Sequence, residues 1–282
     1  AIAGSHGRRA GFFAGLALAT MPQWLLVTHQ TMTDMPFVAS MVGALSLFAI
    51  GVQQDPEREV RLFELRLPSF DGAGRGAALR IGAHHLVLGA ITLTIVPQIA
   101  MLLSQNVWFG DRWPPIKLVV DTFSSGSPGN CGLPGNDKCS PFSATWPRLQ
   151  PALQSIFWIQ ALAFVLAASW GERRARRLAF LAAWWLVGLA TLAKGAPGVA
   201  IPVACIGAFV ILDRRPKLLL ELEIPAGVMA LGGIVMPWFI AMLVRHGPAF
   251  ADRLLFHDMV ERALGHVHDT NQGDDVSFGY YV

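Results

Sequence analysis

The chain has 282 residues, of which 53% are hydrophobic and only 15% charged, and its formal net charge is +3. An ordinary soluble domain carries about 25% charged residues, so the composition argues against a soluble fold. The basic residues are concentrated in short connections between apolar runs, a pattern typical of membrane orientation rather than nucleic-acid binding. We therefore expect an all-α, polytopic transmembrane helix bundle, with no nucleic-acid partner.

Seven apolar segments follow one another along the chain, and each is a predicted membrane span. They occupy residues 11–28, 36–53, 83–104, 152–170, 178–193, 197–212 and 224–244. Several are shorter than the roughly 20 residues that a perpendicular helix needs. The two segments that flank Lys194 are the shortest, and short or Gly/Pro-interrupted spans are typical of helices that line a cavity. Residues 1–244 are thus interpreted as a transmembrane core with an outer loop at 105–151, and residues 245–282 as an extracytoplasmic segment.

The basic residues predict the orientation of these spans. They lie in four connections, namely Arg8 with Arg9, then 54–82, 172–177 and 213–217. Because consecutive spans alternate in direction, all four connections fall on one side, which should be the cytoplasm. The opposite side receives 29–35, 105–151, 194–196 and 245–282. We therefore predict a multi-pass protein of the cell inner membrane, with its chemistry on the periplasmic or other extracytoplasmic side.

Two polar breaks in the apolar chain are the main candidates for a functional site, because an ionisable group at membrane depth is costly to keep. Asp34 precedes Pro36, and proline is tolerated in the first turn of a helix. The Asp34 carboxylate either caps the following helix or faces an outer cavity, where it could orient an acceptor or bind a metal or an amine. His29 comes earlier in the same connection and could join such a site.

Lys194 lies in the second break, where Gly195, Pro197 and Gly198 follow it. Glycine lets the backbone approach a ligand closely, and Pro197 should begin the next helix. The ammonium group either binds a phosphate as a point charge or merely snorkels to the membrane surface. Lysine is depleted on the outer side of membrane proteins, which favours the binding role.

The C-terminal segment carries further polar candidates. His257 and Glu261 share a face of a predicted helix over 248–264, and Arg262 is a candidate phosphate contact. His266, His268 and Asp269 follow in a loop. These histidines and carboxylates could hold a divalent cation, or they could contact substrate through hydrogen bonds alone.

The three cysteines have different predicted environments. Cys131 and Cys139 bracket a Gly/Pro/Asn-rich stretch of the outer loop, where a disulfide between them would persist outside the cytosol. Cys205 falls within a predicted span and is interpreted as an inert packing residue.

The Thr-Asp-Met-Pro-Phe motif at 33–37 and the Leu-Ala-Lys-Gly-Ala-Pro-Gly motif at 192–198 resemble the dolichyl-phosphate-mannose protein mannosyltransferase superfamily. The closer likeness is to its bacterial branch, which includes the lipid A aminoarabinose transferase. These are membrane glycosyltransferases of the GT-C type. The resemblance extends from residue 8 to at least residue 270, and it rests on the order, spacing and common outer face of the two motifs.

This resemblance implies transfer of a sugar from a polyprenyl-phosphate donor to a protein, lipid A or glycolipid acceptor at the outer membrane surface. It implies that Asp34 is the second of two acidic catalytic positions and that Lys194 contacts the donor phosphate. The first acidic position would precede residue 1, so the chain is expected to be part of a longer protein. A metal is not obligatory, because the lipid phosphate is already a good leaving group. A lipid or solute transporter and a non-catalytic lipid-binding scaffold are the alternatives.

Overall fold

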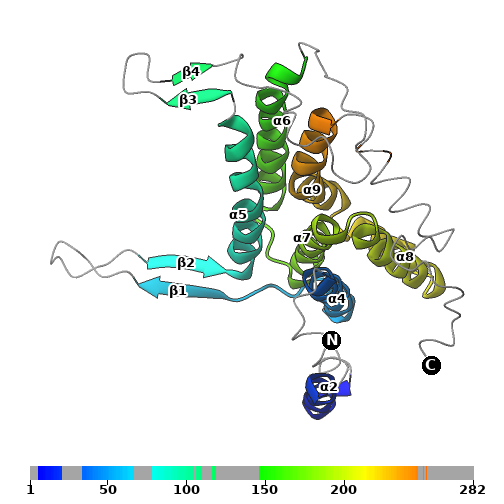
Figure 1. Cartoon of the computed structure of the whole chain (residues 1–282). Coiled ribbons are helices and arrows are strands. Elements are labelled where there is room, and N and C mark those ends of the chain that lie inside the picture. Colours follow the sequence, from blue (N-terminus) through cyan, green and yellow to red (C-terminus); the bar gives the residue numbers. More distant parts are fainter. Residues whose placement is uncertain are drawn as a thin grey trace, which may run out of the picture.

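The computed structural model describes residues 6–20, 34–66, 78–104, 106–109, 116–118, 146–246, 250 and 252. Over these residues the chain is mostly helical, with two short hairpins (Figure 1). The helices are α2 (Arg8–Thr20), α4 (Asp34–Gln53), α5 (Ala83–Leu103), α6 (Trp146–Ser169), α7 (Ala175–Lys194), α8 (Pro197–Leu212) and α9 (Ile224–His246). The predicted all-α bundle of apolar helices is confirmed for the described residues.

Five of the described helices, α4, α5, α6, α7 and α9, are long and apolar enough to cross a membrane. Helix α8 is equally apolar but has 16 residues, which at 1.5 Å per residue gives about 24 Å against a hydrocarbon core of about 30 Å. Helix α2 has 13 residues. Five of the seven predicted spans are therefore confirmed by length and composition, and the remaining two stay predictions.

Helices α6 and α7 both begin earlier than predicted. Helix α6 begins at Trp146 rather than 152, and α7 begins at Ala175 rather than 178. Arg176 and Arg177 thus belong to the first turn of α7, where sequence analysis placed a connection. Their charges are neutralised by glutamates from a distant segment, which lets the helix continue through them.

Helix α7 is central to the described bundle. It packs most extensively along α4 and also contacts α9, α8 and α5. Close approach depends on glycine at two of these contacts. A Cβ at Gly43 of α4 would lie 2.9 Å from Leu186 Cδ1, and a Cβ at Gly188 of α7 would lie 2.9 Å from Ile234 Cδ1 of α9. Because small residues let helix backbones approach closely inside a membrane, these glycines fix α7 between α4 and α9.

Two antiparallel hairpins bracket α5. One consists of β1 (Leu62–Arg66) and β2 (Ala78–Gly82), and β2 leads directly into α5. The other consists of β3 (Val107–Phe109) and β4 (Ile116–Leu118), just after α5 ends. Both project from the bundle at opposite ends of α5 in Figure 1. Neither hairpin was predicted from the sequence.

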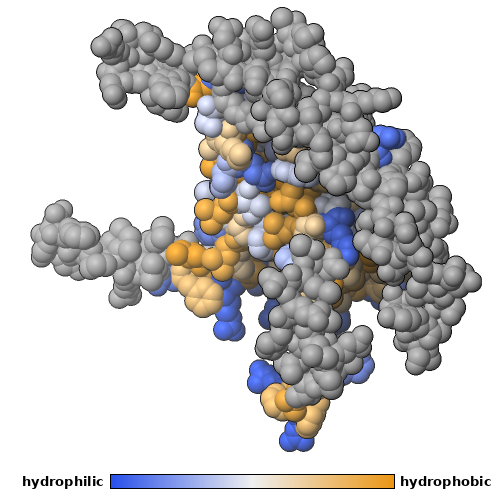
Figure 2. Space-filling view, viewed as in Figure 1, coloured by the Kyte–Doolittle hydropathy of each residue, from blue (hydrophilic) through white to orange (hydrophobic). Residues whose placement is uncertain are grey.

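The bundle has two ends that differ in chemistry. At the arginine end lie the connections 54–61, 170–174 and 213–223, including the 3-10 helix η2 (Pro216–Leu220). Here Val60 N donates to Arg173 O at 2.9 Å, and Ala175 N donates to Arg58 O at 2.8 Å. At the opposite Lys194 end, α4 begins and α7 finishes. Three of the four basic connections that were predicted to share one side therefore meet at one end. Between the ends, apolar residues cover much of the bundle surface in Figure 2.

Candidate functional site

The junction between α7 and α8 sets the position of Lys194. Gly195 caps α7 with φ 75° and ψ −144°, a conformation that favours glycine, and its N–H donates to Thr191 O at 2.7 Å. Pro197 then lies in the first turn of α8, as the sequence predicts. The two helices are separated by only Gly195 and Ala196, so Lys194 is the last residue of α7 and its side chain is exposed.

Gly198 makes this junction tight. A Cβ at Gly198 would lie 2.3 Å from Thr191 N and 2.5 Å from Ala190 C. The first turn of α8 therefore touches the backbone of the last turns of α7, and no larger residue fits there without movement. This contact fixes the angle at which the chain leaves Lys194.

The Lys194 side chain reaches the first turns of α4. Its Nζ lies 5.5 Å from the centroid of the Phe37 ring, within the range of a cation–π interaction. Phe37 is only 7% exposed and follows Asp34, the first residue of α4, by three positions. The two sequence motifs, although 160 residues apart in the chain (Asp34 to Lys194), therefore lie at the same end of the bundle and come into contact through Phe37.

Sequence analysis did not single out Phe37, although it lies inside the first motif. Phe37 could have been recognised from its position three residues after Asp34, because residues three apart share a helix face. The sequence does not reveal how α4 is rotated about its axis, and therefore which neighbours that face meets. That rotation follows from packing at Gly43 and at Gly51, where a Cβ would lie 2.6 Å from Phe180 Cε1.

Most of the predicted site residues belong to segments outside the part of the chain that the structure describes. The Asp34 side chain and all atoms of His29, His257 and Arg262 lie outside the described residues. So do the metal candidates His266, His268 and Asp269 and the disulfide candidates Cys131 and Cys139. Within the part of the chain that is described, no three His, Cys, Asp or Glu side chains gather in a way that could hold a metal ion.

Cys205 differs from its prediction. It lies in α8, as expected, but its thiol is exposed rather than packed inside the protein. The reason is that α8 buries only Gly198, Pro202 and Val210, so most of its surface, including that of Cys205, is left uncovered by the bundle. The interpretation of Cys205 as a packing residue is therefore wrong.

Polar side chains also cross between the helices. Gln98 Nε2 of α5 donates to Ile234 O of α9 at 3.0 Å, and Gln154 Nε2 of α6 donates to Pro237 O at 3.0 Å. Trp185 Nε1 of α7 donates to Thr94 Oγ1 at 3.0 Å. Such bonds hold neighbouring helices together inside a membrane. Because their partners are groups of the bundle itself, we assign them to packing.

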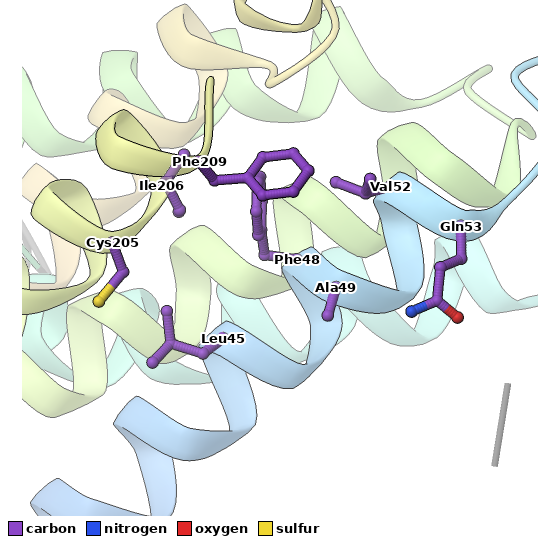
Figure 3. Close-up of a pocket in the computed structure, with 8 residues that line it drawn as sticks. All are labelled: Leu45, Phe48, Ala49, Val52, Gln53, Cys205, Ile206 and Phe209. Carbon is purple, nitrogen blue, oxygen red and sulfur yellow. The ribbon is translucent and has the colours of Figure 1, made fainter. Parts of the chain in front are cut away.

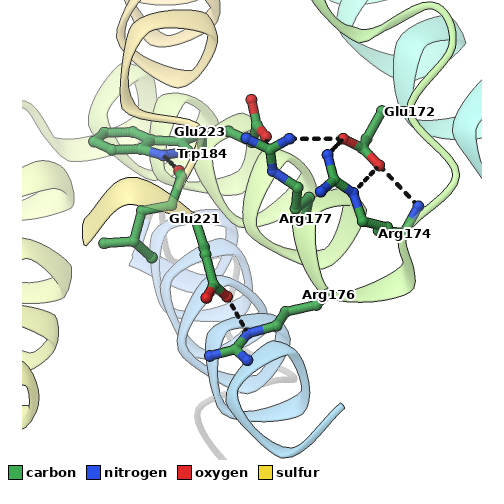
Figure 4. Close-up of polar contacts among 8 residues, drawn as sticks. Glu172, Arg174, Arg176, Arg177, Trp184, Glu221 and Glu223 are labelled. Carbon is green, nitrogen blue, oxygen red and sulfur yellow. Dashed lines mark hydrogen bonds and ion pairs between the residues drawn. The ribbon is translucent and has the colours of Figure 1, made fainter. Parts of the chain in front are cut away.

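The arginine end carries a cluster of three arginines and three glutamates, called here the arginine–glutamate cluster and shown in Figure 4: Glu172, Arg174, Arg176, Arg177, Glu221 and Glu223. Glu172 contacts Arg174 Nη2 at 2.6 Å and Arg177 Nη1 at 3.0 Å. Arg177 also pairs with Glu223. The cluster thereby ties the α6–α7 turn to the segment before α9.

The electrostatics of this cluster follow from its contacts. Hydrogen bonds from the Arg174 guanidinium, the largest effect, hold the pKa of Glu172 down to about 2. Burial raises the pKa of Glu223 above its ordinary value, although the charge of Arg177 acts in the opposite direction. Next to them, Trp184 Nε1 donates to Leu222 O at 2.8 Å. Because each of the three carboxylates is paired with an arginine, the cluster serves as a structural clamp.

The candidate functional site is therefore the Lys194 end, where α4 begins and α7 finishes. Comparison with known proteins adds no assignment, since no family model, no curated protein and no solved structure matches the chain.

Proposed function

We propose that the chain is a GT-C membrane glycosyltransferase that transfers a sugar from a polyprenyl-phosphate donor to a protein, lipid A or glycolipid acceptor. The observation that carries the proposal is the contact between Lys194 and Phe37. It supports a site in which the Lys-Gly-Ala-Pro-Gly motif and the Thr-Asp-Met-Pro-Phe motif act together at one end of the bundle.

The proposed orientation places the arginine end in the cytoplasm and the Lys194 end outside, because arginines and lysines are retained on the cytoplasmic side. With α2 and α8 counted as the first and sixth spans, the protein crosses the inner membrane seven times. Lys194 then stands at the depth of the outer headgroups, where a donor with its polyprenyl tail in lipid presents its phosphate.

The proposed reaction breaks the bond between the anomeric carbon and the donor phosphate oxygen, and the bonding electrons stay on that oxygen. The Lys194 ammonium stabilises the negative charge that develops there. The acceptor hydroxyl oxygen forms the new bond to the anomeric carbon, and its proton passes to a carboxylate base. Asp34 orients the acceptor, and the acidic residue that the resemblance places before residue 1 takes the proton.

The test is transfer of radiolabelled sugar from polyprenyl-phosphate donors by membranes that contain the longer parent protein, which supplies the acidic residue expected before residue 1. We expect donor-dependent transfer to fall by about 10²-fold or more in Lys194→Ala, as for loss of one transition-state charge contact, and to fall similarly in Asp34→Asn. Lys194→Arg keeps the charge and should recover part of the activity. Arg61→Ala is the matched control, because it removes an exposed positive charge at the arginine end.

The outcomes separate the alternatives. Loss of transfer in both site variants with normal transfer in Arg61→Ala supports the proposal. Transfer that survives both site variants would keep the enzyme but refute the site. Absence of transfer from every donor, with normal membrane insertion, would favour a lipid or solute transporter instead.

A further inference from the structure

The register between α4 and α7 brings Phe37 and Lys194 to nearly the same level of the bundle. The two helices run in opposite directions, and a Cβ added at Gly43 of α4 would lie 2.9 Å from Leu186 Cδ1 of α7. Phe37 precedes Gly43 by six positions, about 9 Å along the axis, and Lys194 follows Leu186 by eight positions, about 12 Å. Because side chains lean toward the N-terminus of their own helix, Phe37 and Lys194 lean toward each other across the remaining difference of about 3 Å. Helix packing therefore sets this contact.

The two partners differ in how firmly the protein holds them. The Phe37 ring is only 7% exposed, so neighbouring groups fix its orientation. Lys194 is the last residue of α7 and its side chain is exposed. Its Nζ lies over the Phe37 ring, 5.5 Å from the centroid, and an aromatic face attracts an ammonium group within about 6 Å. A buried, rigid group thus holds the charged end of an exposed, flexible one.

Such a contact prepares a lysine to bind an anion. The side chain has a flexible four-carbon stem, and ordering it has a large entropic cost. Contact with the Phe37 ring orders the stem before any ligand arrives, which is preorganisation. The attraction joins the positive charge to the ring quadrupole, so N–H groups that point away from the ring can still donate hydrogen bonds to phosphate oxygens. The ring therefore fixes the ammonium group without neutralising its charge.

We propose that Phe37 is a positioning residue that holds the Lys194 ammonium where it meets the donor phosphate. In this role the ring acts through the lysine and not on the substrate. The proposal rests on the proposed glycosyl transfer, in which Lys194 contacts that phosphate. Negative charge on the phosphate oxygen grows as its bond to the sugar breaks, so misplacement of the ammonium raises the energy of the transition state more than that of the bound donor. Loss of the ring should therefore lower kcat more than it changes the KM for the donor.

The first test is donor-dependent sugar transfer by membranes that contain the longer parent protein, with kcat expressed per folded molecule. Phe37→Leu removes the ring and keeps a large apolar side chain, and we expect kcat to fall about fivefold, as for loss of one cation–π contact of an exposed lysine. Phe37→Tyr keeps the aromatic face and should retain most of the parental kcat. A purely structural role would lower the amount of folded protein and leave kcat unchanged in both variants. That result, or an equal fall in both, would overturn the proposal.

Phe48 provides the matched control. It is the same residue type in the same helix, is likewise 7% exposed, and lies about three turns further along α4. Figure 3 shows it on the wall of a hollow between α4 and α8. Its ring meets the rings of Phe180 and Phe209 at centroid distances of 5.7 and 5.6 Å. Phe48→Leu should therefore leave kcat per folded molecule unchanged, and a fall equal to that of Phe37→Leu would refute a specific role for Phe37.

A second measurement does not depend on sugar transfer. The protein in detergent is treated with the N-hydroxysuccinimide ester of acetic acid, and mass spectrometry compares acetylation of Lys194 with that of exposed Lys217 in η2. The ring attracts the charged amine, which is the form that does not react. Phe37→Leu should therefore raise the rate at Lys194 about fivefold relative to Lys217, whereas Phe37→Tyr and Phe48→Leu should not.

The two measurements distinguish failure of the function from failure of the positioning role. Absence of transfer from every donor would refute the proposed function, and acetylation would still decide whether Phe37 holds Lys194. Normal transfer by the parent protein with an unchanged acetylation rate in Phe37→Leu would refute the positioning role and leave the proposed function standing.

Discussion

Replacement of Gly198 by alanine should disturb the Lys194 end, because the added methyl group would collide with the backbone of α7. The new Cβ would lie 2.3 Å from Thr191 N, whereas ordinary contact begins at 3.4 Å, so α8 has to withdraw by about 1 Å from α7. The obstacle is backbone and cannot rotate away. Overpacking of this kind costs about 2 kcal/mol, which for a chain of this size lowers Tm by roughly 3 °C.

Gly207→Ala is the control for this prediction. Gly207 lies in the same helix, and no atom lies within 4 Å of the position that its Cβ would occupy. Alanine there should leave Tm unchanged or raise it, because glycine is the weaker helix former by about 1 kcal/mol. Both variants can be compared with the parent by thermal unfolding in one detergent, followed by the fluorescence of the nine tryptophans. Equal Tm values for Gly198→Ala and the parent would refute the tight junction between α7 and α8.

Three further predictions concern the contacts between helices. Because the folded-state pKa of Glu172 is about 2, below the ordinary value of 4.5 for a glutamate, its ionised form stabilises the fold above about pH 5 and loses this effect as the pH falls toward 2. Glu172→Gln should therefore cost about 2 kcal/mol at pH 7, measured as a lower Tm, and a gap that stays constant down to low pH would contradict the ion pairing. Trp184→Phe removes the hydrogen bond to Leu222 O and should lower the free energy of unfolding by about 1 kcal/mol. An unchanged Tm would contradict this prediction. Gln98→Leu removes a bond to a carbonyl of α9 and should cost only about 0.6 kcal/mol, the average for such bonds in membranes, so a loss several times larger would mean that this bond organises the bundle.

The sequence predicted the long helices well because apolar runs of bilayer length carry a strong signal. The segment predicted at 83–104 corresponds to α5 at Ala83–Leu103, and the segment predicted at 36–53 corresponds to α4 at Asp34–Gln53. The start of α7 was predicted too late, because Arg176 and Arg177 look like a loop until their glutamate partners are known. The hairpin β1–β2 was missed, since five-residue strands beside a membrane span give little periodic signal.

The site was predictable in its location but not in its contacts. Alternation of spans is enough to place Asp34 and Lys194 at the same end of the bundle. The approach of Lys194 to Phe37 depends on the rotation of two helices about their axes, and that rotation is set by single glycines such as Gly43 and Gly51. The exposure of Cys205 likewise depends on which face of α8 the neighbouring helices cover, which no local pattern records.

The arginine–glutamate cluster has a consequence for biogenesis. Topology during membrane insertion depends on arginine and lysine, and acidic residues contribute little to it. Arg176 and Arg177 are synthesised before Glu221 and Glu223, so they leave the ribosome with those two carboxylates still absent, and only Glu172 is already present beside Arg177. In the proposed orientation, the two arginines then act as cytoplasmic retention signals. Once the segment before α9 emerges, the same two arginines receive their partners. In that proposed orientation, one pair of residues serves first to orient the nascent helix hairpin and later to hold the segment before α9 against α7.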